Sequence, residues 1–437
     1  VTITDERVDR KELGTTRISP AEVQNLPSIL QPDLFRSLQL LPGVKSASDF
    51  SSGLYVRGGS PDQTLVLLDE APLYNPTHVF GFFSTFNPDA IGDVVLYKGG
   101  YPAPYGGRLG AVVDISTKRP DRDEIRGGAG LGLLSSSAYV QGPFDLRSRS
   151  GTDGSWMVAA RRSTIEPLLS VMSNAGVDDI PTDFYFYDVN ASGTFELNER
   201  NRFALSLYAG RDQLNYPFLD DAVFDIRYGN RAATATWQHD LRDNLSMTWA
   251  GGYSHYFADP VARLAGTEFV RDTDVYDARL TTSVVWRPGD QHTLEAGATV
   301  GHYLTRLRNS FNGDPSYSPR VATLYSSAYL QDTYAPAWAP DLELTGGLRV
   351  NHYAQGGYVR PAPRLRANYQ LTDNVRLQAG YGRYYQYLTA VSTELFSAFD
   401  FWLTTDDQVP PSYGDQFLAG VKTTPFAGGA EGPLDNL

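Results

Sequence analysis

The feature that most constrains the fold of this chain is a two-residue alternation of apolar and polar side chains, repeated in many segments after about Glu124. In Phe203–Ala209 the apolar residues fall on every second position, and in Asp277–Trp286 polar residues occupy the alternate positions. Successive side chains of a β-strand point to opposite faces of a sheet, so each such segment predicts a strand with one apolar and one polar face. The pattern recurs at 293–300, 342–351 and 375–381.

The length of these segments indicates which kind of sheet they form. An ordinary antiparallel sheet with one solvated face is the simplest interpretation. However, many of the runs exceed the usual strand of about 5–6 residues, and they approach the ~9–11 residues with which a tilted strand crosses a bilayer. Aromatic residues lie near the run ends at Trp286, Trp338, Tyr384 and Tyr385, as the interfacial girdle of a membrane barrel requires. We therefore expect a transmembrane β-barrel.

The connections between the runs fall into two classes. Tight polar turns are expected at 198–201, 241–244, 288–290, 340–341 and 371–374. Longer connections are expected between them, at 165–182, 212–222, 258–267, 309–320 and 388–412. Short turns at one end and long loops at the other are typical of outer-membrane barrels. A soluble sandwich has no reason to sort its loops in this way.

Composition excludes several functions. The net charge of −13 argues against nucleic-acid binding, because such binding needs Lys and Arg to neutralise phosphates. The chain has no Cys, which removes disulfides, thiolate metal sites and thiol nucleophiles from consideration. The six His show no metal-binding spacing, and no Walker loop or dinucleotide fingerprint is present. The sequence therefore predicts neither a cofactor nor an enzyme.

The first 120 residues have a different texture and predict a small mixed domain. Residues Leu34–Leu41 carry apolar side chains at helical spacing, after an Asp that can cap the first turn and before a terminating Pro42-Gly43. Short strands are expected in the runs that Gly, Pro or Asp bound, namely Leu54–Arg57, Thr64–Leu68, Val94–Tyr97 and Ala111–Thr117.

Three segments of this domain carry a family resemblance. They read LQLLPGV at 38–44, LYVRGGSPDQTLVLLDEAPLY at 54–74 and IGDVVLYKGGYPAPYGGRLGAVVDISTK at 91–118. In order and spacing they resemble the plug domain of TonB-dependent outer-membrane receptors. Glu70 departs from the pattern, since that family usually has Gly after Leu-Asp. The motif residues are Arg57, Gly58, Gly59, Asp69, Lys98, Gly99, Tyr105, Gly106 and Arg108.

The resemblance implies a mainly β fold, in which a small α+β plug domain lies inside a large antiparallel transmembrane β-barrel. Its boundaries are expected at 11–120 for the plug and at 121–437 for an N-terminal portion of the barrel. Residues 1–10 would be an extension whose Val1, Thr2, Ile3 and Thr4 resemble the TonB box, which adds a strand to the energy-transducing protein TonB. That start could equally be a cut end.

A volume argument concerns the size of the barrel. About fourteen strands are expected between Glu124 and Phe426. A plug of ~120 residues occupies on the order of 16,000 Å³, whereas a fourteen-strand lumen holds roughly 10,000 Å³. A wall of about 22 strands has ample room. We therefore expect about eight further strands, so that this chain is one portion of a longer protein.

Two groups of residues are candidates for contact with a ligand. Tyr74, His78 and Phe82 lie in the aromatic plug segment YNPTHVFGFFSTFN and are candidates to line a substrate path. The alternative for this segment is that Phe80, Phe82, Phe83 and Phe86 form the plug core. Tyr387 and Trp402 lie in a long aromatic loop, which either contacts substrate or packs on neighbouring loops.

Ionic contacts between plug and wall are also expected. Arg57, Lys98 and Arg108 are candidates to pair with inward carboxylates such as those of Asp277, Glu295 and Glu343. The alternative is that these three plug charges are merely solvated.

The function that the resemblance implies is TonB-dependent uptake of a scarce nutrient, of the siderophore, glycan, peptide or cobalamin class, from the bacterial outer membrane into the periplasm. The implied partners are TonB with its inner-membrane energising complex, outer-membrane lipid and the nutrient. A weaker likeness to Bacteroidetes-type receptors adds a surface lipoprotein. Two rivals remain open at this point: a receptor-like barrel that serves as a structural or assembly subunit of an envelope complex, and a soluble β-rich enzyme.

Overall fold

The computed structural model describes residues 13–19, 22, 32–46, 53–145, 153–176, 181, 183–219, 221–391 and 397–423. The fold consists of a small five-stranded sheet and a much larger antiparallel sheet that begins near residue 126. The prediction of a mainly β chain, with a small α+β unit enclosed by a large antiparallel sheet, is confirmed. Among the described residues, no helix is both long and apolar enough to span a membrane.

The small unit, here called the plug, is built on a sheet with the strand order β1-β8-β9-β4-β5. Strands β4 and β9 run parallel, and the other neighbours are antiparallel. Its strands are β1 (Thr15–Ile18), β2 (Val44–Lys45), β3 (Tyr55–Val56), β4 (Thr64–Leu68), β5 (Ala71–Pro72), β6 (Thr77–His78), β7 (Phe83–Ser84), β8 (Ile91–Tyr97) and β9 (Ala111–Thr117), and its helices are α3 (Leu34–Gln39), η1 (Pro61–Gln63) and η2 (Val79–Gly81).

Helix α3 forms where the sequence predicts it. The side chain of Asp33 caps the helix by accepting a hydrogen bond from the backbone N–H of Arg36 at 2.9 Å. Leu34, Phe35 and Leu38 are buried in the plug core, where the Phe35 ring lies 5.4 Å from that of Phe86. The helix buries one side against the sheet, and this packing offsets the weak intrinsic stability of a six-residue helix.

The large sheet, here called the wall, follows one path of fourteen strands, which agrees with the count expected from sequence. Strands β10 and β27 lie at its two edges. The strands on the path are β10 (Arg126–Leu131), β11 (Ser135–Asp145), β12 (Asp153–Ser163), β13 (Asp183–Asn198), β14 (Asn201–Leu219), β15 (Ala222–Arg242), β16 (Leu245–Ala258), β18 (Thr267–Gly289), β19 (His292–Phe311), β21 (Arg320–Tyr334), β22 (Leu342–Tyr353), β23 (Tyr358–Thr372), β24 (Val375–Gln386) and β27 (Ser412–Thr423).

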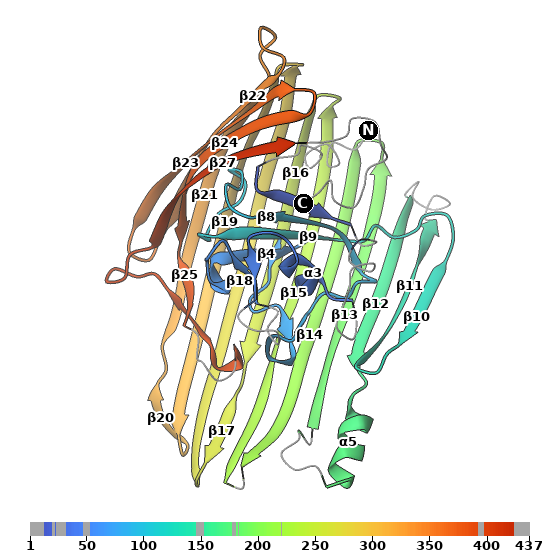
Figure 1. Ribbon diagram of the computed structural model, residues 1–437, viewed down its shortest axis with the longest axis vertical. Helices are drawn as coiled ribbons and strands as arrows, with labels where there is room; N and C mark the ends of the chain where they lie inside the picture. Colours follow the sequence, from blue (N-terminus) through green and yellow to red (C-terminus); the bar gives the residue numbers. More distant parts are fainter. Residues whose placement is uncertain are drawn as a thin grey trace.

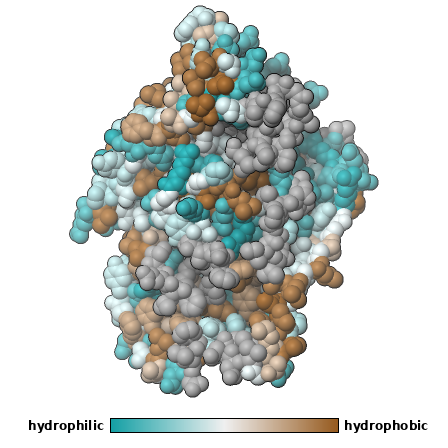
Figure 2. Space-filling model, in the orientation of Figure 1, coloured by the Kyte–Doolittle hydropathy of each residue, from teal (hydrophilic) through white to brown (hydrophobic). Residues whose placement is uncertain are grey.

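The predicted alternation defines the two faces of the wall. On β18, Asp277 is fully buried and faces the plug, whereas Leu280 is 52% exposed on the outer face. Outward leucines and valines recur along the neighbouring strands, among them Leu205, Leu207, Val300, Leu324, Leu330, Leu348 and Leu365. The opposite, concave side is a mosaic of hydrophilic and hydrophobic patches where Figure 2 views it. An apolar outer face is what a lipid-facing barrel requires.

Two of the four aromatics assigned to an interfacial girdle are placed differently. Trp286 and Trp338 are 45% and 76% exposed, as expected. Tyr384 and Tyr385 are buried, so their assignment to the girdle is wrong. Tyr384 points inward and packs on Tyr101 of the plug, with ring centroids 4.3 Å apart. Tyr385, the next residue of β24, points to the opposite face and is buried in a cluster with Tyr353, Ala362 and Tyr387.

Several connections predicted to be long loops are instead ordered. The segment 212–222 is almost entirely strand, because β14 continues to Leu219 and β15 begins at Ala222. The other connections contain α5 (Glu166–Asn174), β17 (Val261–Leu264) and β20 (Asp314–Tyr317), and the last contains β25 (Leu388–Val391), η3 (Ser397–Phe399) and β26 (Phe401–Thr404). Continued cross-strand pairing satisfies the backbone of these extensions, which a turn-based reading of Pro and Asp did not anticipate.

The two ends of the wall differ, and the plug lies between them. In Figure 1 the short turns lie at the upper end, and α5, β17 and β20 lie at the lower end. We name these the short-turn end and the long-extension end. The plug strands β4, β8 and β9 cross the concave face of the wall near its middle.

Candidate functional site

The connection between β24 and β27 folds inward onto the plug and closes the site from the long-extension end. Gln386 Nε2 donates to Asp62 Oδ2 of the plug at 3.0 Å. Leu388, Phe399 and Trp402 are buried, and the Phe399 ring lies 6.3 Å from that of Phe224 on the wall. We call residues 388–404 the inner loop. Of the two roles considered for this segment, its described part packs against plug and wall.

Beneath the inner loop, one plug cation is held by aromatic faces. The Arg108 guanidinium lies 5.4 Å from the centre of the Trp402 ring and 5.8 Å from that of Tyr74. Tyr74 and Trp402 meet edge to face at 5.2 Å. Arg108 is only 5% exposed and has no ion pair with any carboxylate among the described residues. Its Nη1 reaches the carbonyl of Leu388 at 3.5 Å, and its buried Nε has no hydrogen-bond partner.

Tyr74 connects this cation to a buried carboxylate of the wall. Its hydroxyl donates to Asp277 Oδ2 at 3.1 Å, and the Tyr325 hydroxyl donates to Asp277 Oδ1 at 2.7 Å. Arg279 pairs with the same carboxylate at 3.0 Å. Burial, together with the Asp277 charge, raises the pKa of Tyr74 well above its ordinary value, so the phenol remains a neutral donor. Asp277 therefore holds the part of the plug that carries Tyr74 and Arg108, which we call the plug apex, against the wall.

A cavity of about 530 Å³ extends from this cluster along one side of the plug. Near the inner loop it is lined by Tyr74, Arg108, Tyr303, Tyr325, Tyr353 and Tyr387. Farther toward the short-turn end its lining includes Arg202, Gln238, Arg287, Thr293 and Glu295, which lie close to the short turns. Between these two groups, hydroxyl side chains supply much of the cavity lining, among them Thr234, Thr281, Thr299 and Ser327. The cavity thus connects Tyr74 and Arg108 with the short-turn end through a lining of mixed polar and apolar side chains.

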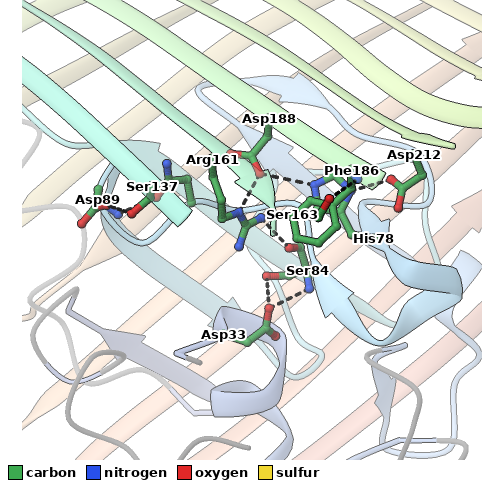
Figure 3. Close-up of polar contacts among 11 residues, drawn as sticks. Asp33, His78, Ser84, Asp89, Ser137, Arg161, Ser163, Phe186, Asp188 and Asp212 are labelled. Carbon is green, nitrogen blue, oxygen red and sulfur yellow. Dashed lines mark hydrogen bonds and ion pairs between the residues drawn. The ribbon is translucent and has the colours of Figure 1, made fainter. Parts of the chain in front are cut away.

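A second group of contacts anchors the plug to the wall through His78 (Figure 3). His78 Nδ1 lies 2.5 Å from Asp212 Oδ2, and Nε2 lies 3.4 Å from Asp188 Oδ2. The backbone N–H of Val79, a residue with a positive φ of 54°, donates to the other oxygen of Asp212 at 2.9 Å. The imidazole stacks on Phe186 at 4.5 Å, and its side chain is 1% exposed.

The anchor extends through Arg161 to helix α3. Arg161 Nε pairs with Asp188 at 2.7 Å, and its Nη2 donates to the carbonyl of Ser84 at 3.0 Å. Ser84 in turn donates from its N–H and hydroxyl to Asp33, the residue that caps α3. Around the imidazole, the carboxylates of Asp188 and Asp212 are matched by Arg161 and His78 only when His78 is protonated (Figure 3). The third buried carboxylate of the network, that of Asp33, is held by hydrogen bonds from Ser84 and from the backbone N–H of Arg36.

The environment of His78 favours its charged form. Burial acts to lower the pKa of His78, but the Asp212 charge and the contacts with Asp188 and Asp212 outweigh burial. The pKa is raised above its ordinary value. The raised pKa favours the imidazolium form, in which His78 clamps the aromatic plug segment to β13 and β14.

The motif residues of the plug occupy tight turns. Arg57 and Gly58 have φ values of 50° and 84°, and Gly59 N–H donates back to Val56 at 2.9 Å, which closes a turn of the type that Gly favours. Gly99, with φ 110°, requires a glycine for the same reason. Asp69 accepts from the backbone N–H of Thr117 at 2.8 Å and so joins the turn after β4 to the end of β9.

Two further motif residues are set by packing. The Tyr105 hydroxyl donates to Asp114 at 2.6 Å. Gly106 lies against the wall, where a Cβ would stand 2.6 Å from Arg349 Nε. Glycine at this position is therefore required for close approach and not for backbone conformation.

The expected ion pairs between plug cations and wall carboxylates do not form as predicted. Lys98 Nζ donates to the carbonyl of Pro42 at 3.2 Å, and Arg108 has the aromatic surroundings described above. Asp277 uses its oxygens for tyrosines and for Arg279 of its own strand. The alternative, a merely solvated charge, is wrong for Arg108 as well, because that side chain is buried.

The five residues proposed for a substrate path do not lie together in the structure. Tyr74 and Tyr387 line the cavity, and Trp402 covers Tyr74 from the inner loop. His78 belongs to the anchor. Phe82 lies beside α3, where the Arg36 guanidinium is 5.3 Å from its ring. Phe83 and Phe86 are buried in the plug, which agrees with the alternative that this segment supplies core residues.

Sequence reasoning missed the wall residues that hold the plug. Asp188, Asp212, Arg161, Arg349 and Arg364 all occupy inward positions of alternating strands. Alternation therefore contained a signal that they face the lumen. It contained none for which of them meet the plug, because that depends on register. Val1, Thr2, Ile3 and Thr4 lie outside the described residues. Within the described part of the chain, no group of three or more potential metal ligands occurs.

Comparisons with known families agree with this geometry. The family model described as "TonB dependent receptor-like, beta-barrel" matches residues 171–432, and the model described as "TonB-dependent Receptor Plug Domain" matches residues 14–112. The first of these alone covers more than half of the chain. A search of curated proteins gave no match.

Solved structures show the same fold. A mutant of the ferric enterobactin receptor PfeA from Pseudomonas aeruginosa aligns with a TM-score of 0.67 at 17% identity, over 97% of this chain and 70% of the receptor. The siderophore receptor PirA from the same organism gives 0.62 at 16% identity, over 94% and 72%. The outer membrane transporter YddB from Escherichia coli gives 0.66 at 13% identity, over 94% and 67%.

Proposed function

Because the chain belongs to the family of TonB-dependent outer-membrane receptors, we propose that it binds a small anionic nutrient of the siderophore class at the plug apex and passes it to the periplasm. The family transports nutrients across the outer membrane, and this assigns the short-turn end to the periplasm and the long-extension end to the cell surface. We propose the domain boundaries expected from the sequence, 11–120 for the plug domain and 121–437 for the portion of the barrel.

The choice of an anionic ligand rests on the burial of Arg108 and on the groups that surround it. A buried guanidinium without a carboxylate partner is costly, and among the described residues ring faces and carbonyl groups surround that of Arg108. An anionic ligand would supply the missing charge and the missing acceptor for Nε. The nearby rings of Tyr74 and Trp402 suit a ligand that also carries flat or aromatic groups. Solved relatives of this fold include receptors for ferric enterobactin and other siderophores.

The inner loop determines access to Arg108. It covers the cation at rest, so binding requires at least a local displacement of Trp402 and its neighbours. Release to the periplasm requires the plug to loosen from the wall, and TonB would act on the segment that contains Val1–Thr4. The surface lipoprotein expected from sequence stays a prediction, and no described feature favours the structural-subunit or enzyme alternatives.

The proposal is tested by titrating the detergent-solubilised receptor with ferric enterobactin as the first probe and following quenching of Trp fluorescence. We expect saturable quenching in the wild type and a Kd about 10-fold higher or more in Arg108→Ala, since a hydrogen bond to a charged group contributes about 1.5–3 kcal/mol. The matched control is Arg263→Ala, which removes an exposed surface cation of β17 that pairs with Glu268. Equal affinity in all three proteins would contradict a role for Arg108.

A further inference from the structure

Two arginines on the inner face of the wall hold one continuous segment of the plug by its backbone. Arg349 of β22 donates from Nη1 to the carbonyls of Ala103 and Pro104, at 3.2 and 2.9 Å. Arg364 of β23 donates to the carbonyls of Tyr101, Pro102 and Tyr105. Five consecutive carbonyl groups therefore converge on two guanidinium groups. Arg366 extends the row by donating to the carbonyl of Gly100.

The sequence of the held segment explains why it presents acceptors. It reads Tyr101-Pro102-Ala103-Pro104-Tyr105, and proline has no backbone N–H. The N–H of Ala103 is taken by Gln331 Oε1 at 3.0 Å, and that of Tyr105 by the carbonyl of Pro102 at 3.2 Å. The backbone that faces the arginines thus offers oxygen atoms almost alone, as an oxyanion would.

These backbone carbonyl groups differ from an oxyanion because they carry no net negative charge. Arg349 and Arg364 are 7% and 5% exposed, and neither has an ion pair with a carboxylate in the described part of the chain. Neutral carbonyl groups supply hydrogen bonds but leave two buried positive charges uncompensated, and the buried Nε of Arg364 has no hydrogen-bond partner. Guanidinium forks fit carboxylate and similar oxyanions better than they fit neutral carbonyls.

The two side chains are fixed in place without the plug backbone. Ser327 and Asn351 of the wall accept from Arg349 at 2.6 and 2.9 Å. The Arg364 guanidinium lies 4.7 Å from the centre of the Tyr384 ring, which is also on the wall. Both arginines would therefore keep their orientation if residues 101–105 moved away. Arg349 also lines the cavity that begins at Arg108.

We propose that Arg349 and Arg364 form an anion-binding station on the wall, which plug carbonyls occupy at rest and which the anionic group of the ligand occupies once residues 101–105 withdraw. The ligand class is an oxyanion, carboxylate or phenolate. The proposal rests on the transport function proposed above, because it requires the plug to move. In this sequence of events the ligand binds first at Arg108 and then at the anion-binding station, which lies deeper in the lumen.

The station is tested by conductance of the intact receptor in a planar bilayer, with urea added to unseat the plug and chloride as the probe anion. A KCl gradient gives the reversal potential of the open state, and this measurement needs no natural ligand. It therefore remains informative even if ferric enterobactin is not bound. We expect an anion-selective open state whose chloride-to-potassium permeability ratio falls about threefold in Arg349→Gln/Arg364→Gln, because charges that line a narrow path set its local ion concentration.

The matched control is Gln331→Ala/Gln416→Ala. Gln416 Oε1 accepts from the N–H of Gly100 at 2.8 Å, so these two glutamines tie the same plug segment without charge. Their loss should lower the urea needed for opening and leave the permeability ratio unchanged. Arg349→Lys/Arg364→Lys, which keeps the charge, should retain most of the selectivity and shows whether the arginine double variant merely misfolds. A wild-type open state without preference for chloride, or equal ratios in the arginine and glutamine variants, would overturn the proposal.

Discussion

His78 of the plug is held against Asp212 of the wall at 2.5 Å, with both side chains almost completely buried. The contact joins residues 134 positions apart in the chain, and a protonated imidazole supplies the second cation, beside Arg161, next to the carboxylates of Asp188 and Asp212. One of the contacts that hold the plug against the wall therefore depends on the protonation of a single residue. The charged and titratable groups that face it are Asp188 of β13, Asp212 and Tyr208 of β14, and Arg161 of β12.

The first prediction concerns pH. The folded-state pKa of His78 is raised, so its contribution to seating is complete below the unfolded-state value of about 6.5 and is lost as the pH rises through the higher folded-state value. We expect the urea concentration that exposes the plug to protease to fall as the pH rises above about 6.5. In His78→Gln this dependence should be largely absent. An unchanged pH profile in the variant would show that another group controls seating.

The second prediction concerns Arg161. Its replacement by Gln leaves Asp188 buried without its strongest partner, and breaking a buried pair typically costs about 3–5 kcal/mol. We expect the urea concentration that exposes the plug to protease to fall strongly in Arg161→Gln and to recover partly in Arg161→Gln/Asp188→Asn. The control is Arg383→Gln, which breaks a more exposed pair with Asp415 on the same wall and should change plug protection little, because solvent screens that pair. Equal losses in the two single variants would contradict the argument from burial.

The third prediction concerns Gly106. In Gly106→Ala the new methyl group meets Arg349 Nε at 2.6 Å and must displace the guanidinium from the plug carbonyls. We expect a destabilisation of plug seating by about 1–3 kcal/mol, as for other overpacked sites. The clash should be relieved in an Arg349→Gln background. Gly251→Ala, where a Cβ meets no atom within 4 Å, is the neutral control.

The fourth prediction concerns Glu70, where the sequence departs from the usual family pattern. Glu70 has a φ of 72°, a left-handed conformation that costs an ordinary residue roughly 1–2 kcal/mol. Glu70→Gly should therefore stabilise the plug by up to about 1 kcal/mol after the greater flexibility of unfolded glycine is subtracted. Glu70→Ala removes the carboxylate but keeps the strain, so it should give no such gain. Urea-induced loss of plug protection measures both.

The sequence predicted secondary structure correctly where the preferences of neighbouring residues determine it. Helix α3 begins after a capping aspartate, and strands β4 and β9 have the bounds predicted from their β-prone runs. The faces of the wall strands followed from alternation. The predicted loop at 212–222 failed because pairing between β14 and β15 continues past residues that usually mark turns.

The candidate site depended on relationships that no local pattern contains. Alternation places Arg349 in the lumen, whereas Asp212 fell in a predicted connection, and their plug partners lie 246 and 134 residues away. Which inward residue meets which plug atom is set by strand register and by the depth at which the plug sits. The sequence by itself determined the class of fold, the two faces of the wall and the glycine-rich turns, because each follows from the conformational preferences and polarity of neighbouring residues. Only the tertiary structure decided that His78 anchors the plug while Arg108 lies beneath Trp402 without an ion pair to any described carboxylate, because burial and charge compensation are properties of side chains brought together from distant strands.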